Sequence, residues 1–217
     1  MRGHDLKSRL DWKSKLCYNV HVSTLKTNIS ARRFALLNQR KEQLFHINDL
    51  AVLWGISNLN TLRILLKRYT DAGIFYRVYR GFYSTVPLSA LDPILLGAKA
   101  IHGPCYLSTE SVLFEAGYLA QVPQSITFVG EKNHHFSIGS NHYKCRQLSP
   151  QYLYNGAGVE EKNGFLAAGP ERALCDLLYF NPKAHLDKEP SWNNVKALQK
   201  NLGYPLTPER YDRSKSK

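Results

Sequence analysis

The pattern of apolar and polar positions predicts two consecutive helices in the first half of the chain. Apolar residues within Ile47–Trp54 fall on one side of a helix, and Gly55 ends it. Ser57 or Asn58 is placed to cap the next helix by accepting a hydrogen bond from its free amides. This second helix extends to about Ala72. The residue at which this helix begins is set only to within one position, because the turn before it is longer than in the tightest helix-turn-helix pattern.

The second predicted helix separates apolar from polar side chains. Its apolar stripe consists of Leu59, Leu62, Leu65, Leu66 and Tyr69. The opposite side carries Asn60, Arg63, Lys67 and Asp71 at helical spacing. After Gly73, residues 74–84 are rich in strand formers, with Arg80-Gly81 as the turn of a hairpin. Two helices followed by a basic hairpin are typical of a winged helix-turn-helix, which predicts duplex DNA as a ligand.

The outward side of this unit supplies the residue types that DNA requires. Phosphates need cations and base edges need paired donors and acceptors, so Asn60 and Arg63 are candidates for base contacts. Ile64 points away from the apolar stripe and is expected to touch a thymine methyl or to pack under the hairpin. The complete predicted DNA-binding set is Ser57, Asn58, Asn60, Thr61, Arg63, Ile64, Lys67, Arg68, Arg77, Tyr79 and Arg80. The alternative is a solvated helix face with ordinary surface charge.

Charge is unevenly distributed along the 217 residues. Residues 1–90 carry 15 Lys or Arg against 5 acids, a net charge of +10, whereas residues 91–217 carry 14 against 12, a net charge of +2. The asymmetry indicates a polyanion-binding module joined to a near-neutral one. We expect four segments: a basic, mobile extension at 1–29, the DNA-binding domain at 30–88, a second domain at 89–204 and a disordered tail at 205–217. The extension is either an arm along the DNA backbone or the product of a start codon assigned too far upstream.

Cysteine usage and hydropathy point to a cytoplasmic protein. Cys17, Cys105, Cys145 and Cys175 lie far apart and form no CxxC pair, which is typical of reduced thiols. No apolar run approaches the roughly 18 residues of a membrane span, and the basic amino terminus lacks the apolar core of a signal peptide. We therefore expect no membrane association.

The remaining pattern predicts an α+β protein. Ser30 is expected to cap a first helix over residues 31–44. In the second domain, helices are expected after Asp92, from Ser108 to about Gly117, after Pro170, and from Ser191 to Gly203. Strands are expected at residues 125–129, 136–138 and 142–148, with one more within 159–168. These elements make a mixed domain of helices around a small antiparallel sheet.

Three segments of the chain resemble the AbiE-type (AbiEi) antitoxin family of type IV toxin–antitoxin systems. They are Gly73-Ile74-Phe75-Tyr76-Arg77-Val78-Tyr79-Arg80-Gly81-Phe82-Tyr83, Tyr106-Leu107-Ser108-Thr109-Glu110-Ser111-Val112-Leu113 with Gly117, and Gly169-Pro170-Glu171-Arg172-Ala173-Leu174-Cys175-Asp176-Leu177-Leu178-Tyr179. Their order and spacing fit over about residues 31–203. The resemblance implies a non-enzymatic antitoxin that represses its own operon by binding inverted repeats at the promoter. Its second domain would counter a nucleotidyltransferase-like toxin, without a tight complex being required.

Two features of the second domain take their interpretation partly from this resemblance. Some relatives hold DNA on a basic surface there, for which Lys132, Lys144 and Arg146 are the candidates, although these residues also fit a solvated sheet face. Arg172 and Asp176 are one helical turn apart and are expected to pair on the surface in a structural role. Ser108 is expected to be a helix cap rather than a nucleophile.

The residue types of several enzymatic and metal sites occur in the chain, but not in the arrangement that such sites require. His134, His135, His142 and Cys145 are possible zinc ligands by type, but neighbouring positions on a strand point to opposite faces. Glu160, Glu161 and Lys162 are residue types of a nuclease site but fall in a predicted turn. We therefore expect no catalytic site, no metal and no cofactor. Two alternatives stay open: a winged-helix regulator with no toxin partner, and a DNA nuclease fused to a winged-helix reader.

Overall fold

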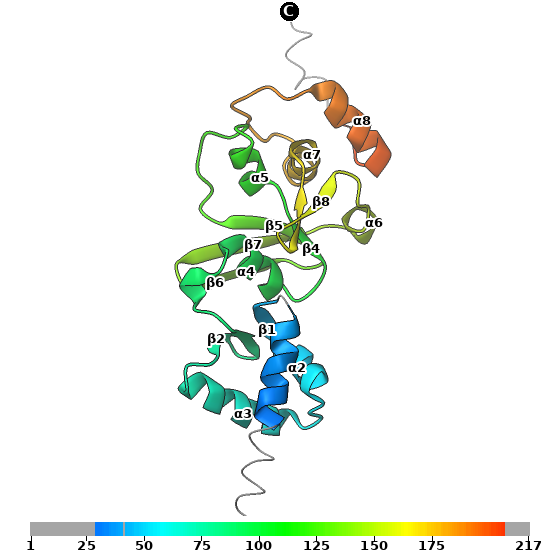
Figure 1. Ribbon diagram of the computed structural model, residues 1–217. Helices are drawn as coiled ribbons and strands as arrows, with labels where there is room; N and C mark the ends of the chain where they lie inside the picture. The colour runs from blue at the N-terminus through cyan, green and yellow to red at the C-terminus, as the bar shows by residue number, and fades with distance from the viewer. Residues whose placement is uncertain (1–28, 41, 207–217) are drawn as a thin grey trace, which may run out of the picture. The chain divides into compact units, whose positions relative to one another are not determined.

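The chain folds into two compact units. A computed structural model describes residues 29–40 and 42–206, so the predicted extension lies almost entirely outside the described residues, as does most of the predicted tail. The units divide between Val86 and Pro87, and the sequence placed the boundary after residue 88. Helices and strands occur in both units, so the expected α+β class is confirmed (Figure 1).

Unit 1 combines three helices with a small sheet among its described residues. After a helix at residues 29–39, its elements are β1 (Leu44–His46), α2 (Ile47–Trp54), α3 (Leu59–Asp71), β2 (Tyr76–Tyr79) and β3 (Phe82–Ser84). The sheet has the order β1-β3-β2, and both pairings are antiparallel. The hairpin turns at Arg80-Gly81, as the sequence predicted.

Local sequence explains both ends of the turn between α2 and α3. Gly55 follows α2 with a φ of 64°, a left-handed conformation that glycine adopts without steric cost. Asn58 precedes α3, and its side-chain oxygen accepts hydrogen bonds from the amides of Asn60 at 2.9 Å and Thr61 at 3.2 Å. The start of α3, which the sequence left uncertain by one residue, is therefore Leu59.

The core of unit 1 is built on the apolar stripe of α3. Leu62 and Leu66 are fully buried, and Leu59, Leu65 and Tyr69 pack against the same cluster. Burying a leucine side chain contributes about 2 kcal/mol. The cluster also contains Leu37 and Leu50 from the other helices, Phe45 and Tyr83 from the sheet, and Phe75 from the residue just before β2.

The first helix of unit 1 differs from the prediction. It ends at residue 39, and Leu44 lies in β1, where it pairs with Ser84 of β3. Ser30 lies within the helix and therefore does not cap it. Local periodicity could not reveal this, because β1 forms only through pairing with a strand 40 residues later in the sequence.

Unit 2 is built on a six-stranded sheet with the order β6-β7-β5-β4-β9-β8. Its strands are β4 (Cys105–Leu107), β5 (Ile126–Gly130), β6 (His134–Ile138), β7 (Asn141–Gln147), β8 (Val159–Lys162) and β9 (Phe165–Ala168). Its helices are η1 (Leu88–Ala90), α4 (Pro93–Ala100), α5 (Glu110–Glu115), α6 (Pro150–Leu153), α7 (Pro170–Phe180) and α8 (Trp192–Leu202). The expected small antiparallel sheet is wrong, because β4 runs parallel to β9 and β5 parallel to β7.

Helices cover both faces of this sheet. Gly97 of α4 lies against the ring of Tyr143 on β7, so close that an added Cβ would be 2.4 Å from it. Arg146 of β7 points to the opposite face, where its partners are Glu110 of α5 and Phe180 of α7. In Figure 1, α4 lies on one side of the sheet, and α5 and α7 lie on the other.

Two further predictions for unit 2 need correction. The segment 159–168 holds two strands, with Asn163-Gly164 as the turn, rather than one. Ser108 does not cap α5; Thr109 precedes the helix, and the Ser108 hydroxyl donates to the buried carboxylate of Asp176 at 2.7 Å. Asp92 does cap α4, accepting from the amide of Ile94 at 2.7 Å.

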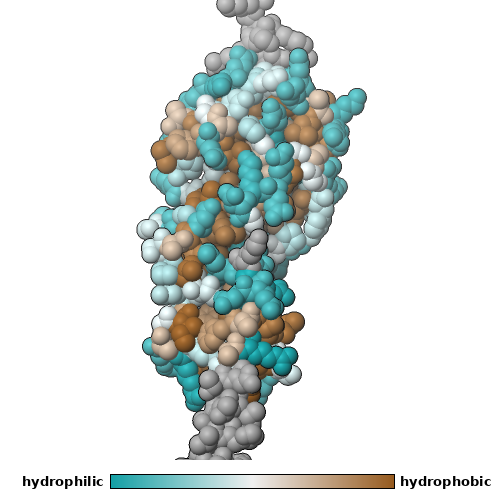
Figure 2. All heavy atoms as spheres, in the orientation of Figure 1, coloured by the Kyte–Doolittle hydropathy of each residue, from teal (hydrophilic) through white to brown (hydrophobic). Residues whose placement is uncertain are grey.

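The helices of the described residues are too short or too polar to cross a lipid bilayer. On the face of unit 2 seen in Figure 2, hydrophilic and apolar side chains are interspersed.

Candidate nucleic-acid interface and a buried ion pair

The outward side of α3 is exposed and already ordered by internal hydrogen bonds. Arg63 donates to the side-chain oxygen of Asn60 at 2.7 Å. Lys67 forms an ion pair with Asp71 at 2.8 Å, and both side chains are mostly exposed. These contacts hold the polar groups of α3 close to the helix surface. An exposed pair of this kind adds little to stability, so it is available for exchange with a ligand.

A groove lies between α3 and the β2–β3 hairpin. Its volume is about 560 Å³, and its walls consist of Ile47, Arg63, Lys67, Thr70, Asp71, Arg77, Arg80, Gly81 and Tyr83. Four of these residues are cations and one is an acid. The two cations of α3 and the two of the hairpin therefore line a single concave surface, which favours a polyanion.

The other predicted DNA-contacting residues are exposed but do not line the groove. Ser57, Asn58, Thr61 and Arg68 are exposed around α3. Ile64 is 58% exposed, which matches its expected position outside the apolar stripe. The ring of Tyr79 lies 5.1 Å from that of Phe82, and burial raises the pKa of its hydroxyl.

The three predicted basic residues of unit 2 are not equivalent. Lys132 is exposed in the turn between β5 and β6, and Lys144 lies on β7 beside His135. Arg146 forms an ion pair with Glu110, and its guanidinium lies 5.4 Å from the centre of the Phe180 ring. Arg146 is therefore already held by protein groups.

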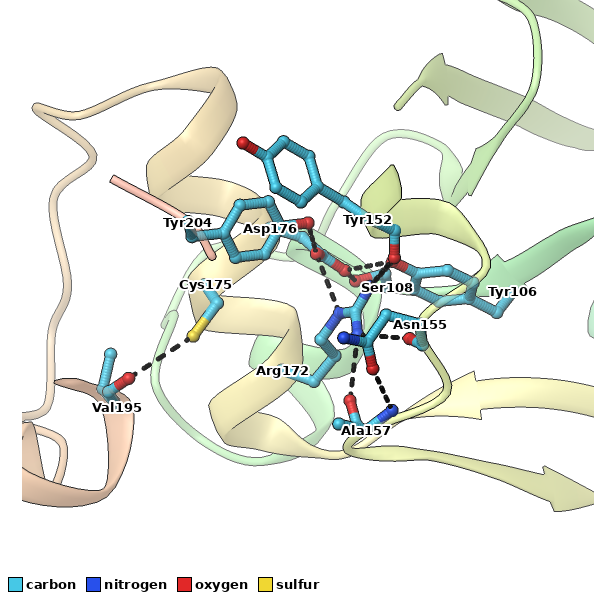
Figure 3. Close-up of polar contacts among 10 residues, drawn as sticks. All are labelled: Tyr106, Ser108, Tyr152, Asn155, Ala157, Arg172, Cys175, Asp176, Val195 and Tyr204. Carbon is cyan, nitrogen blue, oxygen red and sulfur yellow. Dashed lines mark hydrogen bonds and ion pairs between the residues drawn. The ribbon is translucent and has the colours of Figure 1, made fainter. Parts of the chain in front are cut away.

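Arg172 and Asp176 lie in the interior of unit 2, which corrects the expected surface pair. Both side chains have 0% exposure, and the Arg172 Nε lies 3.1 Å from Asp176 Oδ1. The i,i+4 spacing on α7 brings them together, as the sequence indicated. Their burial follows from the elements packed around α7, which Figure 3 shows converging on the pair.

Every N–H of the Arg172 guanidinium has an acceptor. Nε donates to Asp176, and Nη1 donates to the backbone oxygens of Asn155 at 2.8 Å and Ala157 at 2.9 Å. Nη2 donates to the hydroxyl of Tyr106 at 2.8 Å and to the backbone oxygen of Tyr152 at 2.7 Å. An arginine has five such donors, so this buried charge is fully satisfied.

The carboxylate of Asp176 is equally well supplied with donors. Besides Arg172, it accepts from the hydroxyls of Tyr204 at 2.6 Å, Ser108 at 2.7 Å and Tyr106 at 2.9 Å. Burial raises the pKa of Asp176, while Arg172 and the three hydroxyls act in the opposite direction. Burial and the charge of Asp176 both raise the pKa of Tyr204, which keeps its hydroxyl protonated as a donor.

This cluster joins four separate parts of unit 2. Tyr106 comes from β4, Asp176 from α7 and Asn155 from the segment after α6. Tyr204 follows Gly203, which ends α8. The sequence identified the Arg172–Asp176 pair but missed both tyrosines, because no local signal connects residues so far apart. With every group paired and none exposed, the arrangement fits a structural role.

The residue types considered for metal and nuclease sites do not converge. His134 and His135 are neighbours on β6, and Glu160 and Glu161 are neighbours on β8, so each pair points to opposite faces. Burial raises the pKa of Cys145 to about 12, which keeps the thiol protonated. Over the described residues, no three His, Cys, Asp or Glu side chains gather as a metal site would require.

Comparison with known proteins finds distant structural similarity. Neither a protein-family model nor a curated protein matches this sequence. Among solved structures, the RV2827C protein from Mycobacterium tuberculosis is similar at 14% identity with a TM-score of 0.44. The match covers 81% of this chain and 67% of that one.

Proposed function

We propose that the protein is a DNA-binding transcriptional repressor and that unit 1 is a winged helix-turn-helix whose α3 enters the major groove. The order of its elements, with two helices joined by a short turn and followed by a hairpin, fits that fold. The observation that carries the proposal is the groove in which Arg63, Lys67, Arg77 and Arg80 converge. Cations on a helix and on an adjoining hairpin suit the phosphate backbone of a duplex.

Within this proposal, α3 divides into base-reading and phosphate-binding positions. Arg63 donates to Asn60, and in the part of the chain that the structure describes its remaining N–H groups have no other partner, so they can address a guanine in bidentate fashion. Lys67 pairs with Asp71 in the free protein and would exchange this partner for a phosphate. Ile64, exposed between them, is suited to contact a thymine methyl.

Two variants separate these roles. Arg63→Ala should weaken binding to the promoter of the protein's own operon by about 1 to 3 kcal/mol and relax the preference for sequence. Lys67→Ala should weaken binding to all sequences and reduce the salt slope by roughly one. Gel-shift titrations at several salt concentrations measure both effects.

Lys162→Ala, which removes an exposed cation of unit 2, is the matched control and should bind DNA as the unaltered protein does. If all three variants bind alike, the assignment of α3 to the groove of DNA is wrong.

We also propose an antitoxin role, which rests on the resemblance to AbiE-type antitoxins rather than on the geometry. The repressor would then control its own operon by binding inverted repeats, and its functional partner would be a nucleotidyltransferase-like toxin encoded next to it. Co-expression with the neighbouring gene, scored by growth, tests this role. If growth is arrested equally with and without this protein, the antitoxin role is wrong and the protein is a regulator with no toxin partner.

A further inference from the structure

The two edges of the six-stranded sheet differ in the side chains that they present. At one edge, β8 carries Glu160, Glu161 and Lys162, and charged residues of this kind discourage pairing with another chain. At the other edge, β6 has the sequence His-His-Phe-Ser-Ile and contains no Asp, Glu, Lys or Arg. Its register with β7 is continuous over five residue pairs, without a bulge. Within residues 29–40 and 42–206, the β6 edge therefore has none of the charges that protect the β8 edge.

The turn of the β6–β7 hairpin determines which backbone groups of β6 point outward. Gly139 and Ser140 form a two-residue turn between Ile138 and Asn141, which face each other in the register. The pair that closes such a turn exchanges hydrogen bonds, and bonded and non-bonded pairs then alternate. His135 and Ser137 fall on non-bonded pairs. Their N–H and C=O groups point away from β7, toward the position of a further strand.

The surroundings of this edge are basic. Residues 132–147 include Lys132, Lys144 and Arg146 but no Asp or Glu, and of these three cations Arg146 is paired with Glu110. His135 faces Lys144 in the register, and Ser137 faces His142, so these four side chains share one face of the sheet. The other face holds Phe136, which stacks on Tyr143 with ring centres 4.9 Å apart.

We propose that the β6 edge docks an extended acidic segment of a partner protein as an additional strand. The open backbone groups of His135 and Ser137 supply the hydrogen bonds of such β-augmentation. Acidic side chains of the segment lie beside His135, with Lys144 one strand further on the same face and able to reach toward them. The alternate apolar side chains of the segment lie beside Phe136. This protein-binding surface lies on unit 2, whereas the proposed DNA-binding surface lies on unit 1.

A synthetic peptide tests the proposal directly. A fluorescein-labelled ten-residue peptide of alternating Glu and Val is titrated with the full chain and followed by fluorescence anisotropy. We expect saturable binding. The same peptide with N-methyl groups on alternate residues keeps its charge but blocks one hydrogen-bonding edge, and should bind at least tenfold more weakly. A peptide of alternating Lys and Val should also bind at least tenfold more weakly.

Variants of the protein locate the site. Lys144→Glu, on the strand beside β6, should weaken binding at least fivefold, whereas Leu166→Glu, an exposed position on β9 next to the opposite edge, should leave it unchanged.

Three results would overturn the proposal: no saturable binding, equal binding of the N-methylated peptide, or equal effects of the two variants. Analytical ultracentrifugation of the protein alone tests for a dimer. If the protein forms a dimer and Lys144→Glu dissociates it, the occupant of the β6 edge is a second copy of the chain rather than an acidic segment of a partner.

Discussion

Gly158 shows how a single residue can be essential to the buried ion pair without contributing a polar group. Its φ is 74°, and a Cβ at this position would lie 2.9 Å from the Cβ of Arg172. The backbone oxygen of Gly158 also accepts from the amide of Gly169 at 2.8 Å, which ties the segment to the start of α7. The absent side chain therefore allows this segment to lie directly over Arg172.

We expect Gly158→Ala to destabilise the protein by at least about 2 kcal/mol, since a left-handed backbone strain is added to a steric contact. Gly203→Ala is the matched control, because Gly203 has a φ of 73° but nothing within 4 Å of its added Cβ. It should cost only about 1 kcal/mol. Denaturant unfolding measures both values, and equal losses would show that the contact with Arg172 has no effect.

Glu110 gives the stability of unit 2 a defined dependence on pH. Burial opposes its ionisation, but hydrogen bonding and the charge of Arg146 together hold its pKa below the ordinary value of 4.5. A lowered pKa in the folded state means that the contribution is complete above pH 4.5 and is lost as the pH falls through the folded value.

Glu110→Gln should therefore be less stable than the unaltered protein at about pH 6, and the difference should shrink as the pH falls to about 3. Chemical unfolding across this range measures the difference. Glu115→Gln, which alters an exposed carboxyl on the same helix, serves as control and should not produce the same pH-dependent gap. A gap that stays constant with pH would contradict the assignment of Glu110.

At the scale of elements, local signals located the helices far better than the short strands. The caps and stops at Asp92, Gly55 and Gly203 mark helix ends correctly, because each acts through bonds or backbone angles within a few residues. β1 and β4 have three residues each, too few for alternation to be read. Both exist because distant strands pair with them.

α4 illustrates how an element and its neighbour share a constraint. Gly97 weakens a helix in isolation, yet its missing side chain lets α4 approach the rings of Tyr143 and Phe128 on the sheet. The glycine is therefore explained by close packing between a helix and two strands, and the periodicity of α4 alone gives no indication of it.

At the scale of the whole molecule, each unit has its own core. Leu66 belongs to the cluster of unit 1, and Leu174 on α7 is buried in unit 2. We expect Leu66→Ala to lower the opening free energy of amides in unit 1 by about 2 to 5 kcal/mol and to leave those of unit 2 unchanged. Leu174→Ala should have the reverse effect. Native-state hydrogen exchange measures both, and a loss of protection in both units from either change would indicate a single cooperative core.

The amino-acid sequence by itself determined most of the longer helices, the two-sided character of α3 and the concentration of basic residues in the first half of the chain. These properties depend on neighbours within one or two turns, or on charge alone. It also brought Arg172 and Asp176 to the same face of α7, since helical spacing is local.

Only the tertiary structure decided that this pair is buried, because Tyr106 and Tyr204 reach it from parts of the chain remote from α7. The tertiary structure likewise brought Arg63 and Arg80 to one groove and placed β6 at the edge of its sheet. Each of these results depends on pairing or packing between distant segments. No short stretch of sequence contains that information.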